Sequence, residues 1–203
     1  MGNLLHIDTS VRAEGSVSRE VTAAFAAAWR AEHPEGGYRY RDLGADPLPH
    51  VGADVVDLRA SGGDHPLARE VEAEVLVADT VLLGAPMYNF TIPSSLKAWL
   101  DWIAAPEFIA DAQGGGTLLG DKRVVVVTAR GGSYRPGTPR APMDFQEPYL
   151  RAVLGFLGLD RRLEFVHAEM TMAHARAELA QFKGLADESR EEAHRAVRTL
   201  AVG

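Results

Sequence analysis

The sequence predicts an α/β protein in which helices cover both faces of an open, doubly wound parallel sheet. Apolar, strand-like runs alternate with amphipathic helical patterns along the whole chain. The runs at Thr80–Leu83 and Val124–Val127 are continuously apolar, as is typical of parallel strands covered on both faces. Five strand–helix units in 203 residues, of which 46% are hydrophobic, are expected to form a single domain over residues 1–203.

The elements are expected in regular alternation. The predicted strands are Leu4–Ile7, Tyr38–Tyr40, Thr80–Leu83, Val124–Val127 and Leu163–Ala168. The predicted helices follow the periodic runs after Val17, from Pro66, between Pro93 and Ile103, around Tyr149–Leu157, and along the C-terminal region with an interruption near Gly184. The third strand is expected to stop in a Gly-Pro turn at Gly84–Pro86, and residues 104–120 are expected to form a surface loop.

Composition excludes several classes of function. A net charge of −7 argues against nucleic acid as a partner. The absence of cysteine excludes disulfides, thiolate nucleophiles and iron–sulfur clusters, and it suits a reducing compartment. No apolar run is long enough to cross a bilayer, and the start lacks a signal-peptide pattern. We therefore expect a soluble cytoplasmic protein without a membrane partner.

The loops after the first, third and fourth strands are the candidate site. Right-handed crossovers place ligands at the carboxyl ends of parallel strands. If the strand order is 2-1-3-4-5, these loops converge at one edge of the sheet.

The loop after the first strand is rich in hydroxyl groups. It runs from Asp8 to Ser16 and has only Gly15 where a dinucleotide-binding loop would have several glycines. Thr9, Ser10, Ser16 and Ser18 suit a terminal phosphate monoester next to a helix N-terminus. The alternative, that Ser16 only caps the helix, stays equally open.

The other two loops suit a flat ligand. Met87, Tyr88, Asn89 and Phe90 combine apolar surface with an amide that can meet a polar ring edge. In Thr128–Tyr134, the pair Gly131-Gly132 can expose consecutive backbone amides. The alternatives are an ordinary hydrophobic corner for the first of these loops and a flexible turn for the second.

Several motifs are spread along the chain: Ser10 with Ser16-Val17-Ser18, Arg41-Asp42-Leu43 with Pro47-Leu48-Pro49, Pro86-Met87-Tyr88-Asn89-Phe90, Ile92-Pro93-Ser94-Ser95-Leu96-Lys97, Arg130-Gly131-Gly132 and Pro148-Tyr149-Leu150. Together they resemble the FMN-dependent NADH-azoreductases, a family of flavodoxin-like quinone and azo reductases. The resemblance implies a five-stranded flavodoxin-like sheet in the order 2-1-3-4-5 and a homodimer with its sites at the subunit interface.

The resemblance also implies roles for individual residues. Ser10, Ser16, Val17 and Ser18 would bind the FMN phosphate, while Met87, Tyr88, Asn89, Phe90, Ala129, Arg130, Gly131 and Gly132 would line the isoalloxazine ring. The chain departs from the family at Ala129, where a Ser is common, and at Tyr134, where a His is frequent. The stretch between Pro49 and Pro66 is short, and Phe108-Ile109-Ala110 lacks a second aromatic residue. Because these departures border the substrate side of the site, FMN binding is a safer inference than azo-dye reduction.

The expected activity is a ping-pong, two-electron exchange with NADH or NADPH as donor and a quinone or azo compound as acceptor. No catalytic side chain or metal is required, because the cofactor carries the chemistry. Tyr134 is a candidate donor of a hydrogen bond to the acceptor, or else a surface aromatic residue. The alternatives are an NAD(P)H:FMN reductase and a non-enzymatic electron carrier. A hydrolase is disfavoured because no Gly-x-Ser-x-Gly turn occurs. His6 is expected to be a satisfied core residue.

Overall fold

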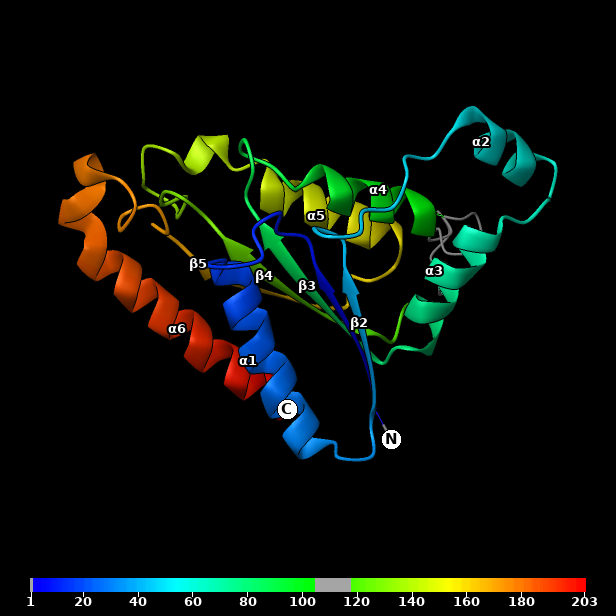
Figure 1. Cartoon of the computed structure of the whole chain (residues 1–203), viewed down its shortest axis with the longest axis horizontal. Coiled ribbons are helices and arrows are strands. Elements are labelled where there is room, and N and C mark those ends of the chain that lie inside the picture. The colour runs from blue at the N-terminus through cyan, green and yellow to red at the C-terminus, as the bar shows by residue number, and fades with distance from the viewer. Residues whose placement is uncertain (1, 105–117) are drawn as a thin grey trace.

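The computed structural model describes residues 2–104 and 118–203 and shows an open parallel sheet between two layers of helices (Figure 1). The strands are β1 (Asn3–Asp8), β2 (Gly37–Asp42), β3 (Thr80–Pro86), β4 (Arg123–Ala129) and β5 (Arg162–Ala168). They pair in the order β2-β1-β3-β4-β5, and every pairing is parallel. The predicted strand order is therefore confirmed.

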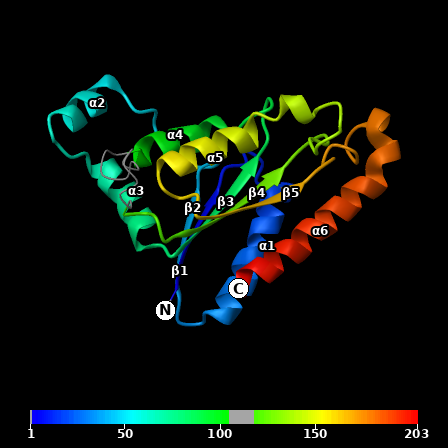
Figure 2. The same ribbon diagram turned by 180° about the vertical axis from the view of Figure 1, so that it is seen from behind.

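The helices divide between the two faces of the sheet. They are α1 (Val17–Glu32), α2 (Ala53–Ala60), α3 (Pro66–Val77), α4 (Ser94–Ile103), α5 (Gln146–Phe156) and α6 (Lys183–Ala201). Helices α1 and α6 lie side by side on one face, and α3, α4 and α5 cover the other, as both views show (Figures 1 and 2). Short 3-10 helices occupy Ala141–Met143 and Ala177–Phe182.

Two apolar clusters fill the space between these layers. Phe25 of α1 and Val197 of α6 pack with Leu82 and Val125 on one face of the sheet. Trp99 of α4 belongs to the second cluster, on the opposite face. All of β3 is buried, which is why its sequence is apolar without alternation.

Local signals fix where several helices begin. Ser16 is the N-cap of α1, and its side chain accepts a hydrogen bond from the amide of Arg19. Pro66 occupies the first turn of α3, where its missing amide hydrogen costs nothing. These helix starts agree with the sequence-based expectation.

Two expectations are wrong. Gly84–Pro86 do not form a turn but continue β3, paired with Val127, Thr128 and Ala129 of β4. Pro86 is tolerated there because it is the last residue of the strand. Helix α2 was not expected, and it buries only Val55, so its sequence has little apolar periodicity.

Residues 105–117, including most of the predicted loop at 104–120 and Phe108–Ala110, lie outside the described part of the chain. Within the described part, no helix has the length and apolar character needed to cross a bilayer.

Candidate functional site

The loops after β1, β3 and β4 meet at one edge of the sheet. We call residues 9–16 the first loop, 87–93 the second loop, and 130–140 the third loop. The amide of Thr9 donates to the carbonyl of Gly84 over 3.0 Å, and that of Met87 donates to the carbonyl of Ala129 over 2.9 Å. The three loops are therefore joined at their bases, and together they form what we call the edge site.

In the first loop, the side chain of Thr9 bonds to the sheet, whereas that of Ser10 bonds within the loop. The Thr9 hydroxyl donates to the carbonyl of Gly84 over 2.7 Å, and Thr9 is fully buried. Ser10 is 2% exposed, and its hydroxyl accepts from the amide of Arg12 over 3.3 Å. Of these two hydroxyls, that of Thr9 is bonded to the sheet, and that of Ser10 has its partners in the loops of the edge site.

The start of α1 is compatible with both interpretations of Ser16, as a helix cap and as a phosphate ligand. Its hydroxyl caps the helix by accepting from the amide of Arg19 and lies 3.2 Å from the hydroxyl of Ser18. Within the described chain, the amides of Val17 and Ser18 have no hydrogen-bond acceptor. Free amides at the start of a 16-residue helix favour an anion, so capping and phosphate binding are compatible here.

The second loop folds as a tight turn with an uncommon backbone. Tyr88 and Thr91 exchange two backbone hydrogen bonds of 3.0 and 3.1 Å. The two residues between them, Asn89 and Phe90, have φ angles of +48° and +70°. Asparagine adopts positive φ readily, but a phenylalanine there is an outlier of the kind concentrated at functional sites.

Tyr88 connects the second loop to the first. Its hydroxyl accepts from the amide of Val11 over 3.2 Å and lies 3.4 Å from the hydroxyl of Ser10. The predicted ring-binding loop thus touches the predicted phosphate loop, although the two are far apart in the sequence.

The third loop offers the backbone amides of two glycines, which the flexible side chains of Met172 and Arg140 approach closely. A Cβ on Gly131 would lie 2.9 Å from Met172, and one on Gly132 would lie 2.8 Å from Arg140. Neither glycine amide donates to an acceptor in the described residues. Because Gly132 is buried, its unpaired amide fits a site completed by a ligand.

The side chain of Arg130 does not take part in this surface. It is 3% exposed and forms ion pairs with Asp144, Glu147 and Glu169 over 2.9, 3.7 and 3.8 Å. Arg130 can therefore contribute to the edge site only through its backbone. The predicted Ala129 ends β4, so it too contributes through the backbone.

His167 lies half-buried beside this cluster. Its two ring nitrogens lie 2.8 Å from the hydroxyl of Thr128 and 3.0 Å from the carboxylate of Glu147. Burial, followed by the nearby guanidinium of Arg130, lowers the pKa of His167. Among the described residues, no group of three or more potential ligand side chains is placed to hold a metal ion.

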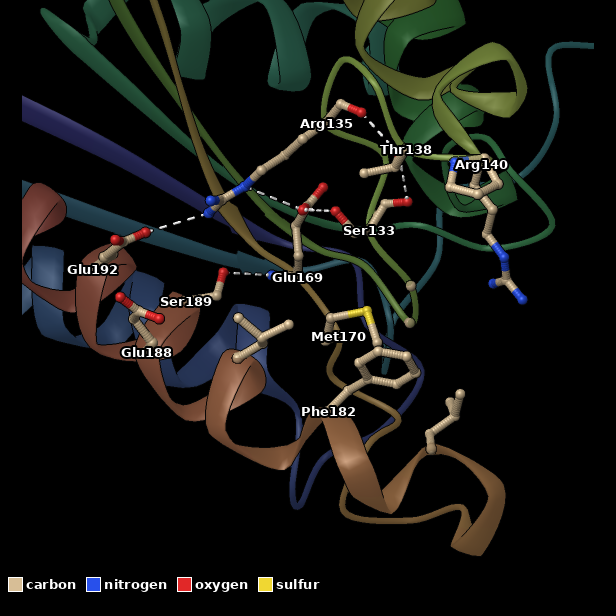
Figure 3. Close-up of a pocket in the computed structure, with 15 residues that line it drawn as sticks. Ser133, Arg135, Thr138, Arg140, Glu169, Met170, Phe182, Glu188, Ser189 and Glu192 are labelled. Atoms are coloured by element: carbon tan, nitrogen blue, oxygen red, sulfur yellow. Dashed lines mark hydrogen bonds and ion pairs between the residues drawn. The ribbon is translucent and has the colours of Figure 1, made fainter.

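Glu169, which the sequence interpretation missed, fixes the far end of the third loop (Figure 3). Its carboxylate accepts from the hydroxyl of Ser133 over 2.6 Å and from the amide of Tyr134 over 2.9 Å, and it pairs with Arg135 over 3.3 Å. Its own amide donates to the hydroxyl of Ser189 in α6 over 2.9 Å. A carboxylate directly after a predicted strand is the signal that could have identified it.

A cavity of about 560 Å³ lies between the third loop and the start of α6 (Figure 3). Gly131 and Gly132 form part of its wall, and Met170, Phe182 and Leu185 supply apolar surface. Its volume is in the range of small-molecule sites. It shares the glycine loop with the edge site.

Two further predictions are settled by burial. Tyr134 is only 8% exposed, so the surface-aromatic interpretation is wrong. Its ring lies under the guanidinium of Arg130, with 5.9 Å between the guanidinium carbon and the ring centroid. His6 is 3% exposed, as expected of a core residue, but only its Nδ1 has a hydrogen-bond partner, the hydroxyl of Tyr38.

Comparison with known proteins agrees with this fold. Residues 2–191 match the model of a family described by its flavodoxin-like fold. A protein of Streptomyces coelicolor, named FMN-dependent NADH:quinone oxidoreductase, is 44% identical over 212 residues, which cover 99% of this chain and 94% of the relative. A protein of Xanthomonas axonopodis pv. citri, named FMN-dependent NADH:quinone oxidoreductase 1, is 47% identical over 168 residues, which cover 82% of this chain and 84% of the relative.

Solved structures show the same architecture. The crystal structure of an azoreductase from Bacillus anthracis superposes with a TM-score of 0.83 at 27% sequence identity, and the match covers 100% of this chain and 99% of that one.

Proposed function

The chain belongs to the family of FMN-dependent NADH:quinone oxidoreductases with a flavodoxin-like fold, and from this premise we propose that it uses NADH or NADPH to reduce quinones, aromatic azo compounds or both through bound FMN. The observation that carries the proposal is the convergence of three loops that offer unpaired backbone amides, hydroxyls and a strained aromatic turn at one edge of the sheet.

The first loop and the start of α1 fit a phosphate monoester. Ser10, Ser16 and Ser18 supply hydroxyls, and the amides of Val17 and Ser18 are free to donate. The site residues Ser10 and Ser16 to Ser18 would therefore hold the phosphate of FMN. These hydroxyls and amides are the donors of the chain that match the acceptor oxygens of a phosphate.

The second and third loops fit a flat, partly polar ring. Met87, Tyr88, Asn89 and Phe90 would cover it on one side, and the backbone from Ala129 to Gly132 would meet its polar edge. The chemistry that bound FMN would supply is two-electron transfer between a nicotinamide donor and an acceptor.

The residues of this chain would bind, orient and stabilise charge. The amides of Gly131 and Gly132, which have no acceptor among the described residues, would act as fixed donors to negative charge that develops at the ring edge. Glu169 keeps those amides in position by binding the following residues, Ser133 and Tyr134. We propose that donor and acceptor use the same face of the ring and therefore bind in turn, which gives ping-pong kinetics.

The cavity beside the third loop is proposed to take part of the acceptor. It adjoins the glycine amides and has an apolar wall that includes Phe182 and Leu185. Tyr134 is not proposed as a donor to the acceptor, because its side chain is buried against Arg130.

A second copy of the chain is proposed to complete the site. Apolar side chains are exposed around the edge site: Val11 is 69% exposed, Phe90 38% and Phe145 59%. Phe145 is tied to the second loop, since its amide donates to the carbonyl of Phe90 over 3.1 Å. A homodimer that covers these side chains would bury apolar surface next to each site. The proposed location is the cytoplasm, where nicotinamide donors are supplied.

One purification tests most of this. We expect the protein to carry flavin absorbance, to release FMN on denaturation, and to oxidise NADH with benzoquinone or an azo dye in the absence of other proteins. Rapid quinone reduction by the protein alone would eliminate a pure electron carrier. Turnover that requires added free FMN would instead favour an NAD(P)H:FMN reductase. Failure to bind supplied FMN would overturn the proposal.

A further inference from the structure

Arg19 lies in the first turn of α1, outside the residues expected to bind the cofactor. Its guanidinium forms a two-pronged ion pair with Asp42 at the end of β2, with distances of 2.5 and 2.8 Å. The same group donates to the hydroxyl of Tyr40 over 2.9 Å and to the carbonyl of Ser10 over 2.7 Å. A side chain of α1 thus joins the end of β2 to the first loop.

The first loop is enclosed at this point from a second direction. A Cβ on Gly44 would collide with the carbonyl oxygen of Ser10, so the chain after β2 packs directly on the loop. Arg19 also touches the other end of the loop, since its backbone amide donates to the hydroxyl of Ser16 over 3.4 Å. One residue therefore contacts both Ser10 and Ser16.

The role of Arg19 is geometric and not that of a free positive charge. Its guanidinium is already neutralised by Asp42, whose carboxylate also accepts from the amides of Gly44 and Ala45 over 3.0 Å each. The hydrogen bond from Arg19 lowers the pKa of Asp42, so both groups stay ionised and bonded to each other at neutral pH. Only 14% of the Arg19 side chain is exposed.

We propose that Arg19 is a positioning residue for the phosphate of the cofactor, because it sets the placement of Ser10 relative to Ser16–Ser18. This inference rests on the proposed binding of FMN. If Arg19 has this role, its removal weakens the binding of a flavin with a phosphate and spares the binding of a flavin without one. General destabilisation of the protein would weaken the binding of both flavins.

The test compares FMN with riboflavin on flavin-free protein. Arg19→Met keeps the unbranched apolar stem of the side chain and removes the guanidinium with its donors, and Arg19→Lys keeps the charge without the fork that matches Asp42. Arg30→Met is the matched control, since Arg30 is a cation of the same helix that lies over the ring of Tyr38, away from the loop. Dissociation constants are measured from the quenching of flavin fluorescence.

We expect Arg19→Met to weaken FMN binding by about tenfold or more, which corresponds to ~1.4 kcal/mol. Arg19→Lys should fall between Arg19→Met and the wild type, and riboflavin binding should change by less than about twofold in every variant. Arg30→Met should bind both flavins like the wild type. Inorganic phosphate should compete with FMN for the wild-type protein and lose that effect in Arg19→Met.

Two results separate this inference from the proposed function. If the wild type does not bind FMN, the proposed function is wrong and the inference falls with it. If the wild type binds FMN but Arg19→Met weakens both flavins equally, or neither, the inference alone is wrong. Should Arg19→Met fail to fold by circular dichroism, Arg19→Lys and Asp42→Asn test the same ratio of FMN to riboflavin affinity.

Discussion

Asn89 allows the backbone of the second loop to be tested separately from its side chain. Asn89 has a φ of +48°, and Phe90 after it has a φ of +70°. Alanine in this left-handed region costs ~1–2 kcal/mol relative to ordinary backbone, whereas glycine adopts it without a steric penalty. Asn89→Ala therefore removes the amide and strains the turn, and Asn89→Gly removes the amide alone.

The expected magnitudes follow from these two contributions. One hydrogen bond between the Asn89 amide and a ring edge contributes ~0.5–1.5 kcal/mol, or about 2- to 12-fold in the dissociation constant of FMN. Both variants should lose this factor. Asn89→Ala should in addition be less stable to urea than Asn89→Gly by ~1 kcal/mol.

The assay is the same pair of flavin titrations, combined with urea unfolding of the flavin-free protein. Riboflavin should lose as much affinity as FMN, because Asn89 is expected to meet the ring and not the phosphate. For Arg19, in contrast, only FMN binding is expected to weaken. Wild-type FMN affinity in Asn89→Gly would refute the ring-edge role, and equal stability of the two variants would refute the strain.

Three other predictions concern the surroundings of the site. Glu169→Ala should lower the free energy of unfolding by ~3–5 kcal/mol, because it leaves the buried amide of Tyr134 without its acceptor and removes a buried carboxylate. Glu169→Gln keeps an acceptor and should lower the free energy of unfolding by only ~1–3 kcal/mol. Equal losses for the two variants in urea unfolding would contradict this prediction. The bond from Arg19 lowers the pKa of Asp42, so the stability from this pair is complete above the ordinary aspartate pKa of about 3.9 and is lost as the pH falls through the lower folded-state value. The stability difference between the wild type and Asp42→Asn should therefore shrink below about pH 4, and a constant difference down to pH 3 would argue against it. Phe182→Ala should raise the KM for an apolar quinone by about tenfold without changing FMN affinity, since ~1–2 kcal/mol of apolar contact is lost; an unchanged KM would remove the cavity from the proposed acceptor site.

Much of the fold follows from local pattern. The continuous runs around Leu82 and Val125 are buried on both faces, as their composition indicated. Ser16 and Pro66 marked helix starts because capping and the proline ring act within one turn. The sequence does not predict helix α2, because only Val55 in it is buried and it therefore has no periodic apolar face.

The third strand shows where a local rule fails. Gly84 and Pro86 are ordinary turn residues, and the sequence alone favours a turn. In the structure, β3 lies between β1 and β4, and pairing with β4 continues as far as Pro86. Tertiary pairing overrides the local preference, and Gly84 is required because a Cβ there would collide with the carboxylate of Asp8.

Sequence alone therefore determined the order of the strands along the chain and of all the main helices except α2, the class of sheet and the three loops that carry the candidate site, because hydrophobic period and capping act over a few neighbouring residues. Tertiary structure alone decided what the charged side chains in and around those loops do. Arg130, expected beside a ring, is buried among three carboxylates, and Glu169 and Arg19 anchor loops that they do not belong to. Arg19 and Asp42 are 23 residues apart in the sequence, and Ser133 and Glu169 are 36 residues apart. Only the packing of the strands and helices can bring such partners within hydrogen-bond distance.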